Sequence, residues 1–484
     1  MDRDLHRTTR VCFLGALLLV GCGGGPTGPS GPSGPPVVAD VNGATQPSGP
    51  TGSTVVIDGQ NFGGAQGSGT VLFSNGTGGT VSAVIASAGD WSNTFIVTTV
   101  PAGAATGPVV VTTTGGTSNA ITFTLTQNAA FNPSTITWTA TNALPVGLSG
   151  HALVFAQLES TTTVRAVYAI GGGDNSSAPV TSVYLATVGG SGTLSGWSPA
   201  KVLPKALAFS GAAVATPANS RVTATGWLYV IGGATDAGGQ PSTTVYRGAL
   251  AADGTVSSWA ETTALPVALH SMGAVIFHGD LYIAGGSTTG NAPAAAVYRS
   301  RIDTSGALGA WQTEVALPFA RAHAGLGALG GYLFTFGGDS GTVAPNTGTL
   351  SASAIADVAS AQIDLRTGDL TSAGWTTNAN KLKKAVTKHT AVVAGGDVLV
   401  TAGLYNGAST GSTEETYAQF NSDGTVGAFN GATGSNTISS VGGGNLFNQA
   451  ALGYTDGNGA FHVLVAGGDD VNTPGTKHSG VFFY

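Results

Sequence analysis

The chain has 484 residues, of which 42% are hydrophobic and only 8% charged, with 77 glycines and a formal net charge of −7 at pH 7. The length predicts two or three domains, and the apolar content excludes a wholly disordered chain. The glycines follow no three-residue period, which excludes collagen. The sequence has no long basic stripe, which argues against nucleic acid as the main partner. Valine, threonine and short apolar runs between turn residues predict an all-β protein.

Residues 1–21 have the pattern of an export signal. Three arginines precede an apolar run, 11–20, that is too short to span a bilayer and suits a secretory signal. The run ends in Leu19-Val20-Gly21-Cys22, which resembles the bacterial lipobox. The resemblance implies cleavage before Cys22 and a diacylglycerol on its thiol, so that a lipid anchor joins the protein to the membrane. The alternative is a plain signal peptide followed by a chance cysteine.

Residues 22–36 contain, after Cys22, only Gly, Pro, Ser and Thr, which predicts a tether without a core. In the sorting rule that the lipobox resemblance implies, an Asp after the lipidated cysteine retains a protein in the inner membrane. Gly23 stands there, so we expect an extracytoplasmic, outer-membrane lipoprotein at the cell surface. Cys12 lies in the removed segment, so we expect no disulfide.

Residues 37–126 contain about seven short apolar or alternating segments, a number that suits a β-sandwich. They are 37–41, 54–58, 70–73, 81–85, 95–100, 108–112 and 120–125. The stretch 52–63, GSTVVIDGQNFG, followed by Val100-Pro101 and by 107–111, GPVVV, resembles the IPT/TIG immunoglobulin-like family. The resemblance implies a spacer, a dimerisation surface or part of a binding protein. Within it we expect Asn61 to cap a turn and Phe62 to fill the core.

Residues 133–484 repeat three features. An apolar strand ending in glycine recurs six times at intervals of roughly 50–65 residues, with its glycines ending at Gly172, Gly233, Gly286, Gly338, Gly403 and Gly468. An aromatic residue follows at Trp197, Trp259, Trp311, Trp375 and Phe429, with Tyr184, Tyr246, Tyr298 or Tyr417 before four of these. A Leu-Pro pair ending at Pro145, Pro204, Pro266 or Pro318 comes before a new unit.

These columns of glycine, tyrosine and tryptophan resemble kelch repeats, as in galactose oxidase. The resemblance implies a six-bladed β-propeller of four-stranded sheets, with strand one after Leu-Pro, strand two ending in glycine, strand three carrying Tyr and strand four carrying Trp. The segment at Trp138 is a fourth strand without a first three, and the chain ends at 481–484 in a third strand without a fourth. We therefore predict that these two segments complete one sheet and close the ring.

Polar residues follow the Leu-Pro junctions and the glycine ends, which share one face in such a topology. The candidate ligand face consists of His151, His270, Arg321, His323, Lys384, Lys388, His389, Asp174, Asp339 and Asp469. These residues predict a pocket for sugars or anions. The competing interpretation is structural, with histidines and arginine in packing and aspartates as turn acceptors.

Complete catalytic motifs are absent from the sequence. Galactose oxidase uses copper and a cross-linked cysteine, and residues 133–484 contain no cysteine, so we predict neither that cofactor nor a metal site. We expect a binding protein for a glycan or a protein partner. The alternative is an extracytoplasmic sugar-active enzyme that uses the His, Arg and Lys residues of the ligand face. Imidazoles grouped around an open pocket favour the enzyme, and imidazoles buried in packing favour binding.

Overall fold

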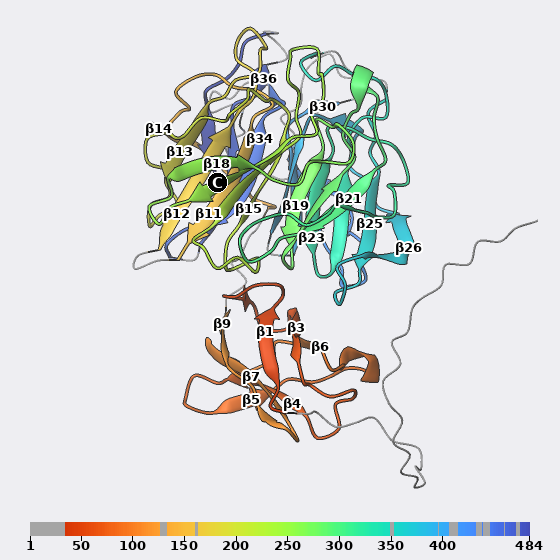
Figure 1. Cartoon of the computed structure of the whole chain (residues 1–484). Coiled ribbons are helices and arrows are strands. Elements are labelled where there is room, and N and C mark those ends of the chain that lie inside the picture. Colours follow the sequence, from red (N-terminus) through yellow and green to blue (C-terminus); the bar gives the residue numbers. More distant parts are fainter. Residues whose placement is uncertain are drawn as a thin grey trace, which may run out of the picture.

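The computed structural model describes residues 34–125, 133–159, 163–348, 353–394, 396–405, 415–431, 438, 446–458, 460–470 and 475–484. The expected signal segment 1–21, Cys22 and most of the tether 22–36 lie outside the described residues. The described chain is all-β, and its helical elements are two 3-10 turns, η1 (Ala88–Asp90) and η2 (Thr289–Asn291). Figure 1 shows a smaller body formed by the N-terminal strands below a larger body formed by the rest of the chain.

The smaller body consists of two sheets that share one apolar core. One sheet has the order β1 (Val37–Val41), β3 (Thr54–Gln60) and β6 (Phe95–Thr99). The other has the order β2 (Ser48–Gly49), β9 (Ile121–Leu125), β7 (Gly107–Thr113), β4 (Thr70–Ser74) and β5 (Thr80–Ser82), with β8 (Gly116–Thr117) beside β7. Side chains of both sheets alternate into the core.

All seven predicted segments of this body overlap strands. The fourth is shorter than predicted, because β5 ends at Ser82. Beyond that end, the hydroxyl of Thr98 donates to the carbonyl of Val84 at 2.7 Å. Phe62 is buried in the core as predicted, and its carbonyl accepts the indole N–H of Trp91 at 3.0 Å. Asn61 occupies the turn in a left-handed conformation, with φ 62°.

The larger body consists of six four-stranded antiparallel sheets, numbered here in chain order. Sheet 1 is β11 (Ala152–Leu158), β12 (Val164–Ile170), β13 (Val183–Thr187) and β14 (Ser198–Pro199). Sheet 2 is β15 (Gly211–Ala215), β16 (Trp227–Ile231), β17 (Val245–Leu250) and β18 (Val256–Glu261). Sheet 3 is β19 (Gly273–Phe277), β20 (Asp280–Ala284), β21 (Val297–Arg301) and β22 (Gln312–Thr313).

The same pattern continues to the end of the chain. Sheet 4 is β23 (Gly325–Leu329), β24 (Tyr332–Phe336), β25 (Val358–Ile363) and β26 (Leu370–Thr377). Sheet 5 is β28 (Thr390–Ala394), β29 (Asp397–Thr401), β31 (Glu415–Gln419) and β32 (Asn430–Gly431). Sheet 6 is β34 (Ala450–Thr455), β35 (Phe461–Ala466), β37 (Val481–Phe483) and β10 (Thr139–Ala140). Two short pairs lie at one end, β27 (Val386–Thr387) with β30 (Leu404–Tyr405) and β33 (Leu446–Phe447) with β36 (Asp469–Asp470).

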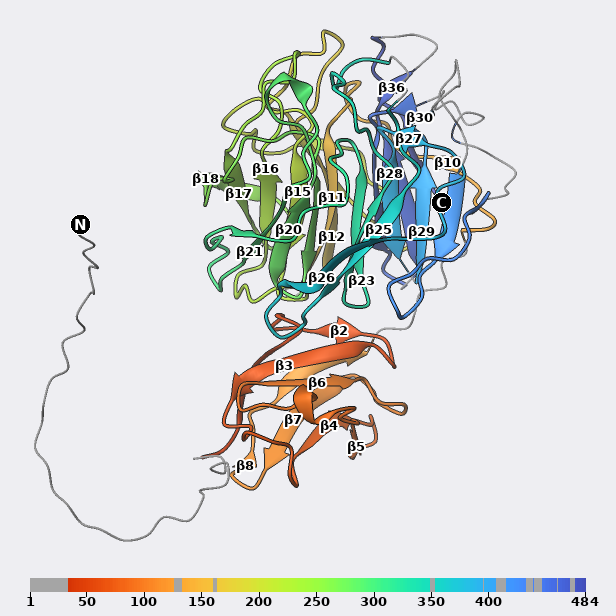
Figure 2. The same cartoon turned by 90° about the vertical axis from the view of Figure 1, so that its right-hand side faces the viewer.

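The six sheets are arranged in a ring. The first strand of each sheet lies beside the first strand of the next, and β34 of sheet 6 lies beside β11 of sheet 1. Figure 2 shows the sheets side by side from a second direction. The predicted pairing of the two ends of this region is confirmed, because β10 pairs with β37 in the register Thr139 to Phe483.

Repeated glycine contacts join neighbouring sheets. The glycine N–H at the end of each second strand donates to a carbonyl just before the first strand of the next sheet, over 2.8–2.9 Å. The six donor and acceptor pairs are Gly172 to Leu207, Gly233 to Leu269, Gly286 to Arg321, Gly338 to Val386, Gly403 to Leu446 and Gly468 to Leu148. Since the last pair joins sheet 6 to sheet 1, the hydrogen bonds run around the whole ring.

Tyrosine and tryptophan make the other repeated links. The hydroxyls of Tyr168, Tyr229 and Tyr282 donate to glycine carbonyls in the turn between strands three and four of the next sheet, for example Tyr168 to Gly254 at 2.5 Å. The fourth-strand indoles also donate to a carbonyl of the preceding sheet, for example Trp259 to Lys201 at 2.9 Å. The tryptophan contacts explain why that aromatic column recurs in the sequence. Tyr168, Tyr229 and Tyr282 lie in second strands and are not the tyrosines of the repeated column, which lie in third strands.

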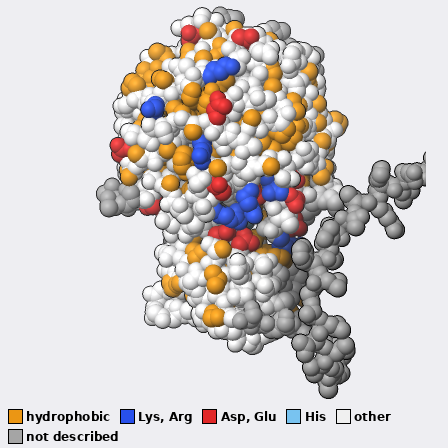
Figure 3. Space-filling view, in the orientation of Figure 1, with side chains coloured by type: hydrophobic (Ala, Val, Ile, Leu, Met, Phe, Trp, Pro, Cys, Tyr) orange, Lys and Arg blue, Asp and Glu red, His pale blue; other side chains and the backbone are white. Residues whose placement is uncertain are grey.

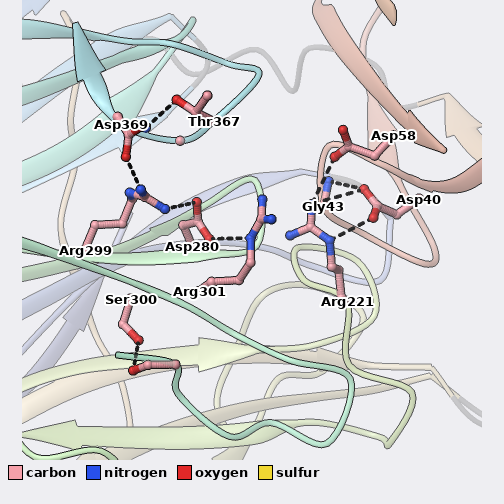
Figure 4. A network of polar contacts seen from close by, with 12 residues as sticks. Asp40, Gly43, Asp58, Arg221, Asp280, Arg299, Ser300, Arg301, Thr367 and Asp369 are labelled. Carbon is pink, nitrogen blue, oxygen red and sulfur yellow. Dashed lines mark hydrogen bonds and ion pairs between the residues drawn. The ribbon is translucent and has the colours of Figure 1, made fainter. Parts of the chain in front are cut away.

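An ion-pair network joins the smaller body to the ring. The Arg221 Nε atom lies 2.8 Å from Asp40 and its Nη2 atom 3.0 Å from Asp58 (Figure 4). Arg221 belongs to the ring and both aspartates belong to the smaller body. Burial, and then the charge of Asp40, raise the pKa of Asp58 to about 6. Figure 3 shows acidic and basic side chains gathered where the two bodies meet, so polar contacts hold this interface together.

The network continues into the ring. Arg299 lies 3.2 Å from Asp280 and 3.0 Å from Glu314, and it also pairs with Asp369. Arg301 lies 3.3 Å from Asp280. The amide N–H of Gln46 donates to the carbonyl of Pro217 at 2.8 Å. The smaller body therefore docks on the end of the ring that carries the loop between β15 and β16.

Candidate functional site

The site lies at the opposite end of the ring, where each first strand begins. The second residue before each first strand adopts a left-handed backbone with φ between 53° and 57°. These six residues, called here the axial ring, are Gly150, Phe209, Ser271, His323, Lys388 and Asn448. Non-glycine residues rarely adopt this conformation, and strained positions of this kind gather at functional sites.

Backbone hydrogen bonds connect the axial ring. The N–H of Phe209 donates to the carbonyl of Gly150 at 2.6 Å, and Ser271 donates to Phe209 at 2.7 Å. In the same way His323 donates to Ser271 at 3.0 Å, Asn448 to Lys388 at 3.0 Å and Gly150 to Asn448 at 2.8 Å. The left-handed conformation directs each backbone toward its neighbour, so these five bonds link the six residues in one continuous row from Lys388 to His323.

The axial ring and the residue after each of its members line a depression of about 150 Å³. Its walls are Gly150, His151, Phe209, Ser210, Ser271, Met272, His323, Ala324, Lys388, His389, Asn448 and Gln449. Every one of the six sheets therefore contributes two residues. A larger hollow, of about 450 Å³, lies at sheet 5 and is lined by residues that include Pro133, Asp397 and Tyr417.

Three of the four predicted histidines line the axial depression, and all three are buried. Burial lowers the pKa of His151 and of His389 to about 4 and lowers the pKa of His323 well below its ordinary value. Among the described residues, the ring nitrogens of His151 and His323 have no hydrogen-bond partner. These imidazoles are consequently neutral at pH 7, each with one donor and one acceptor.

His270 has a different place. Its Nδ1 atom lies 2.9 Å from the hydroxyl of Ser271 and its Nε2 atom 3.1 Å from the amide oxygen of Asn291. It does not line the depression, and its ring centroid is 6.5 Å from that of His323. Burial lowers its pKa to about 4. This side chain fastens the loop that holds η2 to the axial ring.

Lys388 is buried, and its ammonium group already has partners. It donates to the carbonyls of Ala344 at 3.0 Å and Thr347 at 2.6 Å, and it lies 5.7 Å from the ring centroid of Phe447. Burial lowers its pKa to about 7, while the charges of Asp469 and Asp339 oppose that shift. The segment 341–348 also bonds to Asn448, whose amide donates to the carbonyl of Pro345 at 2.8 Å. Lys388 therefore fixes this segment beside the depression.

The three predicted aspartates are separated. Asp469 is buried in an ion pair with Lys477, a residue that the sequence did not single out, and also accepts from Asn448 at 3.3 Å. Asp339 accepts from the N–H of Gly341 at 2.8 Å. Asp174 accepts from the N–H of Ser176 at 2.9 Å in an exposed turn, as the structural interpretation expects.

Arg321 and Lys384 lie away from the depression. Arg321 is 0% exposed, and its Nη1 atom donates to the carbonyl of Gly337 at 3.1 Å, while burial lowers its pKa to about 10. It occupies the apolar position that leucine or valine fills in the other sheets. Lys384 is exposed, with its Nζ atom 5.6 Å from the ring centroid of Tyr405. Of the ten candidates, His151, His323, Lys388 and His389 are the ones that share the depression.

The described residues contain no group of three or more His, Cys, Asp and Glu side chains placed to hold a metal ion. Within the same part of the chain, no helix is long and apolar enough to cross a membrane.

Comparisons with known proteins give little further information. No protein family and no curated protein matches the sequence. Among solved structures, that of YjhT is similar to 70% of this chain over 95% of its own length, with 13% sequence identity and a TM-score of 0.49.

Proposed function

We propose that this chain is a lipid-anchored binding protein of the outer membrane or cell surface. In this proposal the ring of six sheets is a six-bladed kelch-type β-propeller that binds a glycan or a protein partner. The smaller body is a spacer of the IPT/TIG kind. The observation that carries the proposal is the axial depression, to which all six sheets contribute residues at equivalent positions.

The placement of the two bodies supports an outward-facing site. The smaller body follows the tether and docks on one end of the ring through Arg221, Asp40 and Asp58. Strands β30 and β36, which belong to the two short pairs that adjoin the depression, lie at the far end in Figure 1. If Cys22 is held in a membrane, the spacer lies between that membrane and the ring, and the depression is open to partners.

The chemistry of the depression supports binding over acid–base catalysis. A general base works best when its pKa lies near the operating pH. His151 and His389 have pKa values of about 4, and no carboxylate is among the residues that line the depression. Lys388 has a pKa of about 7, but its nitrogen is engaged by the carbonyls of Ala344 and Thr347. Neutral imidazoles and amides instead supply fixed hydrogen bonds to a ligand.

The anchor is tested by expressing the full chain in a Gram-negative bacterium that is fed labelled palmitate. We expect label on the protein and recovery in the outer-membrane fraction. The variant Cys22→Ser should lose the label and leave the outer-membrane fraction, because the lipid that holds the chain there is no longer attached. Ser30→Cys, in the tether, is the control and should keep both properties. An unlabelled parent protein would contradict the anchor.

Binding is tested with the full chain in detergent on a glycan array, together with a pull-down from extracellular fluid. We expect selective capture of a glycan family or of one protein. Silence in both assays, together with turnover of a polysaccharide by the same preparation, would contradict the binding proposal and favour the enzyme.

A further inference from the structure

The axial depression has unused hydrogen-bonding capacity. The ring nitrogens of His151 and His323 and the amide oxygen of Gln449 are buried and lack partners among the described residues. Buried polar atoms without a partner cost about 1–3 kcal/mol each, so such groups are normally satisfied. All three residues line the same hollow, and a bound molecule with its own donors and acceptors would satisfy them.

The depression offers little net charge to a ligand. Its imidazoles are neutral, and its one ionisable cation, Lys388, already donates to two carbonyls. The nearby Asp469 is neutralised by Lys477. A free carboxylate or phosphate would thus find no unengaged cation among the lining residues. Neutral hydroxyls suit the site better, since each can both donate to and accept from a neutral imidazole.

Apolar side chains complete the walls. Phe209 and Met272 are buried at the depression, and the Phe209 ring meets the His323 ring edge to face, with centroids 6.3 Å apart. Pockets for drug-sized ligands have volumes of about 300–1,000 Å³. At about 150 Å³, this depression has room for one small ring. A pyranose has the required combination, with hydroxyls on its edge and C–H groups on its faces.

We propose that the axial depression binds the terminal ring of an uncharged glycan, by hydrogen bonds from its hydroxyls to His151, His323 and Gln449 and by contact with Phe209. This inference rests on the proposed binding function and names its ligand class. Lys388 is, in this view, a positioning residue that holds the segment 341–348, and it makes no ion pair with the ligand.

The first test is calorimetric titration of the full chain with neutral methyl pyranosides and with glucuronic acid. We expect one neutral glycoside to bind and glucuronic acid to bind at least tenfold more weakly. Affinity for the neutral glycoside should stay constant between pH 6 and 8.5, because the lining imidazoles do not titrate there and Lys388, which does, makes no contact with the ligand and keeps N–H donors for its two carbonyls in either protonation state. An anion held by Lys388 would behave differently, because its affinity would fall as that ammonium loses its proton near pH 7.

The second test begins with two variants at His323 whose new residue types already stand at the equivalent position of other sheets. His323→Phe places at one sheet the residue that Phe209 already provides in a left-handed conformation, with φ 55°, and it removes the donor and the acceptor. We expect at least a tenfold loss of affinity with an unchanged melting temperature. His323→Asn copies Asn448 and should retain part of the binding. Ser210→Phe should fill the depression and abolish binding, and Ser191→Phe, on an exposed turn, is its matched control.

The outcomes of these tests distinguish a failure of the uncharged-glycan inference from a failure of the proposed binding function. Preferential binding of glucuronic acid, with an affinity that falls through pH 7, would overturn the uncharged ligand but leave a binding protein. Glycan binding that survives both His323→Phe and Ser210→Phe would place the site elsewhere. The absence of binding to every saccharide would overturn the inference, and the pull-down would then decide whether a protein partner supports the proposed function.

Discussion

Gly467→Ala should lower the free energy of unfolding of the ring by about 2–4 kcal/mol. Gly467 has a φ of 61°, and a Cβ atom there would lie 2.5 Å from the carbonyl oxygen of Leu148 and 2.6 Å from the His151 ring. The left-handed backbone costs an L-residue about 1–2 kcal/mol, and a forced contact in a packed interior adds about 1–3 kcal/mol. Because Gly468 makes the bond from sheet 6 to sheet 1, the strain falls on the closure of the ring.

Ala402 supplies the matched comparison. It occupies the same position in sheet 5, with a φ of 56°, and is the non-glycine exception among the six sheets. Ala402→Gly should relieve the strain and raise the free energy of unfolding by up to about 1 kcal/mol. The greater conformational entropy of glycine in the unfolded chain opposes part of this gain. Urea melts followed by tryptophan fluorescence measure both variants. If neither substitution changed the free energy of unfolding, the position would tolerate either residue and the strain argument would be wrong.

The repeat could be predicted from sequence because the residues at each repeated position make the same kind of contact in each sheet. Glycines end the second strands where a Cβ would strike the next sheet, and Trp259, Trp311 and Trp375 each donate to the preceding sheet. The pairing of β10 with β37 followed from the phase of the repeat. These features are required by packing between sheets, so they recur as residue types.

The site was only partly predictable, because its shared property is a backbone conformation. Gly150, Phe209, Ser271, His323, Lys388 and Asn448 have no side-chain chemistry in common. The distance from the Leu-Pro pair to the nearest histidine also varies between sheets, and a shift of one residue in a strand reverses the direction of its side chain. His270 and Arg321 therefore differ in environment from His151 and His323, although all four follow the junction.

Aligning the first strands in register would have found more of the lining. Once the six starts are aligned, Asn448 and Gln449 occupy the places that Lys388 and His389 occupy in sheet 5. Sheet 6 lacks the Leu-Pro pair, so no residue pattern marks the start of its first strand. Lys477 was not predictable, since its partner Asp469 is eight residues away in the sequence and no local residue pattern links the two.

Trp138→Ala should cost the ring about 3–5 kcal/mol of unfolding free energy, the usual range for deleting a buried tryptophan side chain. Trp138 is 0% exposed and packs among residues of sheets 5 and 6, where its strand completes the ring. Trp375→Ala is the control, because that indole is only half-buried at the outer edge of sheet 4, and it should cost about 1 kcal/mol. Similar losses for the two would show that closure by β10 adds nothing to stability.

The effect of this tryptophan should also depend on pH through Glu415. The Trp138 indole donates to the Glu415 carboxylate at 2.6 Å, and burial raises the pKa of that carboxyl from 4.5 to about 7. Since the folded state holds the proton more tightly, stability should fall by about 3 kcal/mol as pH rises from 4.5 to above 7. Glu415→Gln should remove this slope. Trp138→Phe withdraws the hydrogen bond that favours the charged form, so we expect it to destabilise the ring more at pH 8 than at pH 5; an equal loss at both values would mean that the indole does not stabilise the carboxylate.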